Sequence, residues 1–319
     1  MELFLQNILS PAILFFILGI IAGFLKSDLK IPEQIARYLS IYLMMAIGFK
    51  GGVAIAQTPE FNGQIIAVIL AGIATGFTQP YIGYFLLKLT TKLDKQTAAA
   101  VAAHYGSISM VTFVTAVSFL ESNEILYAGY LIAVLALMEA PAILTGLFIA
   151  KSDDNNSIKP AIGKEILTNG AILLLAGSFL IGWASGDSGM EKMHGFLVEP
   201  FQGILAFFLM EMGLVVSRQM SHLKEFNFKL IAFGIYMPLI GATIGLALSF
   251  IIGLDVGSAT LFTVLIASSS YIAVTAAMQI ALPKAKAAIY IPMTLAITFP
   301  FNIAIGIPLY FNMAQRIIS

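Results

Sequence analysis

Long apolar stretches, separated by short polar breaks, constrain this chain more than any other feature of its sequence. A helix needs about 20 mostly apolar residues to cross a bilayer. Only 11% of the residues are charged, against about 25% in a soluble domain, which is too few to cover a soluble surface. The sequence therefore predicts an all-α integral membrane protein with ten transmembrane helices, at residues 8–25, 33–56, 62–88, 97–120, 125–150, 165–184, 197–218, 227–253, 257–282 and 286–313.

The basic residues predict how these spans are oriented. Of the 17 Lys and Arg residues, 14 lie at or beside the connections that follow the odd-numbered spans. The other three are Lys50, Lys192 and Arg316. Because cytoplasmic loops carry the excess of Lys and Arg, we expect the odd-numbered connections in the cytoplasm and both termini outside.

Charge, cysteine content and missing motifs narrow the function. The formal net charge is zero, so we expect no basic face that binds nucleic acid. The chain has no cysteine, which removes thiolate metal sites and cysteine nucleophiles. It also has no phosphate-binding GxxxxGK[ST] loop and no His or carboxylate cluster with metal-ligand spacing. We therefore expect neither an enzyme nor a cofactor, and uphill transport would draw on an ion gradient.

Two halves of the chain carry similar patterns. Residues 97–150 and 262–311 each contain a small, hydroxyl-rich segment followed by a span with a mid-span proline, Pro141 or Pro300, where we expect the helix to break. The pattern predicts five-helix halves at residues 1–150 and 165–319, joined by a cytoplasmic connection at 151–164. Because five is odd, the halves would have opposite orientations, which is the inverted-repeat plan of secondary transporters.

The hydroxyl-rich segments are the candidate site. Gly106–Ser109 and Ser268–Ser270 gather small polar residues near the middle of apolar spans. Helices interrupted there would direct half-helix N-termini at an anion, while hydroxyls and freed carbonyls coordinate a cation. The alternative is that these small residues only allow helices to pack closely.

Several segments also match a known family in order along the chain. The sequence resembles the cyanobacterial sodium-dependent bicarbonate transporters of the SbtA type over almost its whole length. The segments that carry the resemblance are Ile31-Pro32-Glu33, Ile47-Gly48, Gly51-Gly52, Tyr105-Gly106, Ser109, Thr112, Leu120-Glu121, Glu139-Ala140-Pro141-Ala142, Ala267-Ser268-Ser269-Ser270, Pro283, Ile289-Tyr290 and Ile305-Gly306-Ile307-Pro308-Leu309.

The resemblance implies a ten-helix, 5+5 inverted repeat with a core domain, a gate domain and two discontinuous helices, assembled as a homotrimer in a bacterial inner membrane. It implies sodium-coupled bicarbonate uptake by alternating access. This chain departs from the family where an acid usually follows the serine triplet, because that position is Tyr271. The short connection at 151–164 also argues against regulation by the PII-like partner of those proteins.

We assign the expected site residue by residue. The substrate anion is expected at Gly106, Ser107, Ser269, Ser270 and Tyr271. Sodium is expected at Ser109, Thr112, Ser268 and Glu139, with no other metal. Within the transporter class the alternatives are another small anion or a monocarboxylate, or proton coupling through Glu139. A channel is a further alternative.

Each of the other polar residues in the spans has two interpretations. Glu139, two residues before Pro141, either serves the transported ion or bonds backbone that the proline frees. Glu211 and Lys50 occupy repeat-related positions, and they either pair with each other or lie separately. His104 either responds to pH or is a packed, hydrogen-bonding residue.

Overall fold

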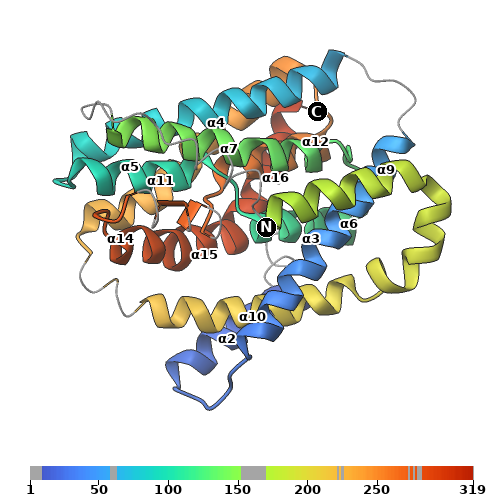
Figure 1. Cartoon of the computed structure of the whole chain (residues 1–319), viewed down its shortest axis with the longest axis horizontal. Helices are drawn as coiled ribbons and strands as arrows, with labels where there is room; N and C mark the ends of the chain where they lie inside the picture. Colours follow the sequence, from blue (N-terminus) through green and yellow to red (C-terminus); the bar gives the residue numbers. More distant parts are fainter. Residues whose placement is uncertain are drawn as a thin grey trace.

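The computed structural model describes residues 9–57, 63–151, 170–220, 223, 226–271, 274–275, 277–278 and 282–318, and every regular element in them is a helix (Figure 1). The α-helices are α2 (Pro11–Phe24), α3 (Glu33–Ala56), α4 (Gly63–Thr90), α5 (Lys95–Gly106), α6 (Met110–Ser122), α7 (Leu131–Lys151), α9 (Gly170–Leu197), α10 (Phe201–Met220), α11 (Phe228–Ile252), α12 (Val256–Ala267), α14 (Ala287–Pro292), α15 (Phe299–Phe301) and α16 (Ile307–Ile318). Two π-helical segments, η2 (Met293–Thr298) and η3 (Asn302–Gly306), flank α15.

The helices are long and apolar enough for a membrane. Six stretches of the described chain could each cross a bilayer by length and composition, and α2 and α12 are shorter apolar helices. Large apolar side chains also face outward, for example Phe85, Phe250 and Ile251. An exposed apolar surface of this kind belongs in lipid, so the chain is a multi-pass membrane protein.

Four helices form one group through glycine-mediated contacts. α2 packs along α10, and α3 packs along α9; Figure 1 shows α2 and α10 side by side along the lower edge. A Cβ on Gly19 of α2 would overlap the backbone of Met210, and a Cβ on Gly52 of α3 would overlap Phe179 O. The backbones therefore meet directly in both pairs, as small residues allow in membranes. We call α2, α3, α9 and α10 the four-helix group.

The remaining helices form a larger group around two deeply buried ones. α5 packs between α4 and α7, and α12 packs against α11 and α16. Every residue of α5 from Thr97 to Gly106 is buried, and so is every residue of α12 from Gly257 to Ala267. A helix that is buried all round lies inside its bundle rather than against lipid. We call α4 to α7, α11, α12 and α14 to α16 the larger group.

Two expectations about helix ends are wrong. The span predicted to end at residue 184 is longer than expected, because α9 continues to Leu197 through a kink at Gly186, whose φ of 54° suits glycine. The chain also stays helical through both prolines. Pro141 lies inside α7. Pro300 lies in α15 between two π-helical segments, and such widened turns absorb a residue that lacks an N–H group.

Candidate functional site

Both predicted interruptions are present. α5 ends at Gly106 and α6 begins at Met110, with the backbone extended at Ser107 (φ −106°, ψ 169°). α12 ends at Ala267 and is followed by an equally extended Ser268 (φ −90°, ψ 176°). Clusters of serine favour such breaks because their hydroxyls compete for the hydrogen bonds of the backbone.

The two helices that lead into the breaks are built alike. α5 and α12 each have 12 residues. Each begins at an aspartate whose carboxylate accepts a hydrogen bond from the backbone N–H three residues later, Asp94 from Thr97 and Asp255 from Ser258, both at 2.9 Å. Partial burial acts to raise the pKa of Asp94, but hydrogen bonds, chiefly from Thr97, and the charge of Lys286 together lower this pKa below its ordinary value. Because the two helices have the same length and the same kind of N-terminal cap, each break lies the same number of residues from the start of its helix.

The breaks contact each other in the interior. The backbone N–H of Ser109 donates to Ser268 Oγ at 2.9 Å, and the backbone N–H of Ser270 donates to His104 O at 2.9 Å. Thr112 Oγ1 donates to Ser109 Oγ, also at 2.9 Å. The structure therefore brings together three of the four residues expected at sodium, Ser109, Thr112 and Ser268. For the fourth, Glu139, the side chain lies outside the described residues.

Two hydroxyls at the breaks have no partner among the described residues. Ser107 is 1% exposed and Ser269 is 2% exposed. The Oγ atom of each is buried and makes no hydrogen bond to any described residue. Buried polar atoms are nearly always satisfied in proteins, and an unpaired one costs about 1–3 kcal/mol. One such atom lies at each break.

Sequence reasoning missed two amide side chains beside the second break. Gln79 Nε2 of α4 donates to Ile266 O at 2.8 Å, and Asn302 Nδ2 of η3 donates to Ala267 O at 2.9 Å. Tyr310 OH donates to the amide oxygen of Asn302 at 2.8 Å. All these groups are buried. The final carbonyls of α12, which form the negative end of that helix, are therefore satisfied by protein donors.

His104 joins the first break to the segment that follows the second. Its Nδ1 lies 2.6 Å from Ala100 O, and because a carbonyl only accepts, Nδ1 donates. Nε2 of the neutral ring then accepts from Thr275 Oγ1 at 3.1 Å. The ring also stacks on Tyr290 with 4.7 Å between centroids. These contacts favour the packed, hydrogen-bonding role over a pH response.

Three expected substrate residues have other contacts in this structure. Gly106 packs against Pro80 of α4, where a Cβ would overlap the proline ring. Tyr271 OH donates to Met212 Sδ of α10 at 3.4 Å, so this side chain bridges the larger group and the four-helix group. Ser270 is buried, and its backbone N–H donates a hydrogen bond to His104 O.

Lys50 does not pair with Glu211. Lys50 Nζ lies 2.5 Å from Glu121 Oε1 at the end of α6, and it also lies over the ring of Phe201. Tyr127 OH donates to the same carboxylate at 2.9 Å. Glu211 is buried in α10, with its Oε2 unpaired among the described residues. The two repeat-related residues therefore lie separately.

Comparison with protein families identifies the superfamily of this chain. A family model for the Na+-dependent bicarbonate transporter superfamily matches residues 11–315. The chain belongs to this superfamily. No match was found among curated proteins. Membership of the Na+-dependent bicarbonate transporter superfamily indicates transport rather than catalysis, and it indicates Na+ and bicarbonate as the transported species.

Proposed function

We propose that this protein is a secondary active transporter that takes up bicarbonate together with sodium by alternating access. The observation that carries the proposal is a pair of buried hydroxyls, on Ser107 and Ser269, that have no partner in the described part of the chain, one at each helix break. An anion between them would accept a hydrogen bond from each. The superfamily match supports bicarbonate as that anion.

The surroundings of the breaks favour an anion at this position. The last carbonyls of α12 already accept hydrogen bonds from Gln79 and Asn302, so their negative ends are satisfied. α6 begins at Met110, and the N-terminal end of a helix favours negative charge. Burying an isolated charge is costly, and sodium held by hydroxyls of Ser109, Thr112 and Ser268 would neutralise the anion.

We further propose the finer architecture that accompanies this mechanism. The matching lengths and caps of α5 and α12 support two inverted five-helix halves, residues 1–150 and 165–319, joined by a cytoplasmic connection at 151–164. The four-helix group would be the gate domain and the larger group the core domain. We expect a homotrimer in a bacterial inner membrane, with both termini outside and no PII-like regulator.

One observation favours a second candidate substrate. Tyr271 stands where the resembled transporters usually have an acid, and its hydroxyl contacts Met212 of α10. A less negative site suits another small anion or a monocarboxylate, with sodium or a proton as the coupling ion. The fold and the two unpaired hydroxyls would serve either substrate.

Uptake into proteoliposomes tests the proposal. Labelled bicarbonate should accumulate only when sodium is higher outside, and accumulation should saturate, which separates a carrier from a channel. Formate and acetate serve as competitors, and dissipating the sodium gradient with an ionophore is the control. Uptake that is independent of sodium but driven by a proton gradient would show that the coupling ion is a proton. Stronger inhibition by formate or acetate than by unlabelled bicarbonate would show that a carboxylate is the preferred substrate.

A further inference from the structure

The four-helix group and the larger group are joined by an ion pair at the end of α6. Lys50 Nζ of α3 lies 2.5 Å from Glu121 Oε1, and Tyr127 OH donates to the same carboxylate at 2.9 Å. Lys50 Nζ also lies 4.9 Å from the centroid of the Phe201 ring of α10. The side chains of Lys50 and Glu121 are only 17% and 30% exposed, so water and salt screen their attraction less than that of a surface pair.

The backbones of the two groups meet beside this ion pair. Gly129, in the connection from α6 to α7, lies so close to α3 that a Cβ on it would come within 2.3 Å of Ala54 Cβ. A Cβ on Gly51 of α3 would lie 2.4 Å from Ile132 Cδ1 of α7. Small residues allow such close approach in membrane proteins. We call this contact between the groups the joint, and its residues are Lys50, Gly51, Glu121, Tyr127 and Gly129.

The joint is attached to both helices that carry the breaks. Glu121 is near the end of α6, the helix that begins at the first break. In the connection that follows, Ala128 N–H donates to Ser258 Oγ at 2.9 Å, and Ser258 Oγ donates to Asp255 Oδ2 at 2.6 Å. Asp255 caps α12, which ends at the second break. The joint therefore connects α3 to the ends of α6 and α12 that lie away from the breaks.

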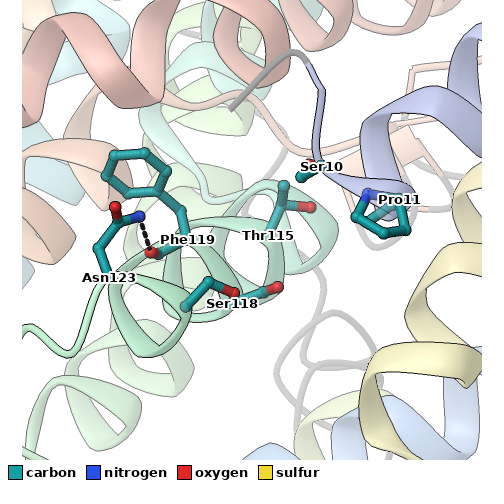
Figure 2. A pocket seen from close by; sticks show the side chains of 8 residues that line it. Ser10, Pro11, Thr115, Ser118, Phe119 and Asn123 are labelled. Carbon is teal, nitrogen blue, oxygen red and sulfur yellow. Dashed lines mark hydrogen bonds between the residues drawn. The ribbon is translucent and has the colours of Figure 1, made fainter. Parts of the chain in front are cut away.

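Open space separates the two groups beside the joint. A cavity of about 410 Å³ lies between α6 and the start of α2, and Figure 2 shows Thr115 and Ser118 of α6 across this space from Ser10 and Pro11. On the same stretch of α6, Ser118 Oγ donates to Gln202 Oε1 of α10 at 2.8 Å. At this point the groups are thus held by polar contacts of α6 with α3 and α10, and not by packing between α2 and α6.

We propose that the Lys50–Glu121 ion pair is a latch, which holds the two helix groups in the present arrangement and opens when they move against each other. This inference rests on the proposed function, because alternating access needs such a movement. A contact favours one arrangement only if it differs between the two, and an ion pair between the groups is such a contact. Removing one charge leaves the other unpaired in the closed joint, which favours the separated arrangement.

The accessibility of single cysteines measures the latch, because the chain has no cysteine of its own. Two reporters lie at buried contacts between the groups. Ile132→Cys lies beside the joint, and Met212→Cys lies at the contact of α10 with Tyr271. Met212 is 11 residues along α10 from Phe201, or about 17 Å at 1.5 Å per residue. The second reporter therefore separates movement of the whole groups from opening of the joint alone.

Each reporter is combined with Lys50→Met, with Glu121→Gln and with both changes together. The matched control is Asp187→Ala, which removes a carboxylate that pairs with an amide of α3 inside the four-helix group. Modification by a water-soluble thiosulfonate is timed in purified protein in detergent, where both sides of the protein are accessible. Ser188→Cys, on an exposed part of α9, gives the rate for a free thiol.

We expect both reporters to react roughly fivefold to tenfold faster in each latch variant, because the rate follows the population of the separated arrangement. The double variant should react no faster than the single ones, since either change already breaks the pair. Asp187→Ala should leave both rates unchanged.

Three results would overturn the latch: unchanged rates at both reporters, a faster rate at Ile132→Cys alone, or an equal rise in Asp187→Ala. Uptake of bicarbonate by the wild type is measured separately. If the wild type takes up no bicarbonate, the proposed function fails, while the modification rates still decide whether the ion pair holds the two groups together.

Discussion

Replacing the two unpaired serines by alanine should strengthen the fold and weaken transport at the same time. Ser107 Oγ and Ser269 Oγ are buried without a partner among the described residues. No described protein group therefore replaces the hydrogen bonds to water that each hydroxyl makes in the unfolded chain. When the anion is bound, the same hydroxyl becomes a donor to a charged acceptor. The stability of the substrate-free protein should consequently rise in these variants, while their affinity for the transported anion should fall.

The magnitudes follow from the hydrogen-bond inventory. An unpaired buried hydroxyl costs about 1–3 kcal/mol, and Ser107→Ala or Ser269→Ala should recover part of this in the free energy of unfolding. A hydrogen bond to a charged group contributes about 1.5–3 kcal/mol, so each variant should lose roughly tenfold or more in affinity for bicarbonate. Ser268→Ala is the matched control, because Ser268 Oγ accepts from Ser109 N–H and donates to Leu265 O. It should destabilise the protein.

Thermal denaturation of the purified protein in detergent, without bicarbonate, measures the first effect, and proteoliposome uptake over a range of bicarbonate concentrations measures the second. The reasoning is refuted if Ser107→Ala and Ser269→Ala transport like wild type, since the serines then only pack helices together. It is also refuted if both variants lose as much thermal stability as Ser268→Ala, since their hydroxyls would then be paired.

Three further outcomes are expected. Asn302→Leu leaves Ala267 O without its donor, so it should lower the free energy of unfolding by about 1–3 kcal/mol; unchanged denaturation would show that this amide does not satisfy the carbonyl. Tyr271→Asp places an acid beside the breaks and should change the ratio of bicarbonate to carboxylate uptake, whereas an unchanged ratio would separate this position from selectivity. For orientation, a cysteine at Asn155 should be labelled only from the cytoplasm and one at Ser188 only from outside, and the reverse pattern would overturn the charge argument.

The helix breaks could be predicted because their signal is local. Serine clusters such as Ser107–Ser109 inside an apolar span offer the backbone competing hydrogen bonds, whatever the rest of the fold does. A sequence also shows the likeness between two such segments directly. The structure places both breaks in the predicted residues and in contact with each other.

The partners of single polar residues could not be predicted, because packing between distant segments selects them. Gln79 is one amide in an apolar helix, and nothing in its neighbourhood in the sequence points to a carbonyl 187 residues away. Likeness between the halves suggested Glu211 as a partner for Lys50, but the end of α6 brings Glu121 to it instead. The predicted breaks at the prolines were wrong for a related reason. Neighbouring helices and π-helical turns can satisfy the backbone groups that a proline leaves without a hydrogen bond, so the helix continues.

The glycine contacts within the four-helix group determine when this part of the protein can form. Gly19 of α2 meets α10, and Gly52 of α3 meets α9, so each pair joins an early segment of the chain to a late one. At about 5–20 residues per second, a ribosome needs roughly 10–35 s to proceed from the end of α2 to the start of α10. Until α10 and α9 have been made, the glycine faces of α2 and α3 lack these partners. Docking of the four-helix group is thus a post-insertion event.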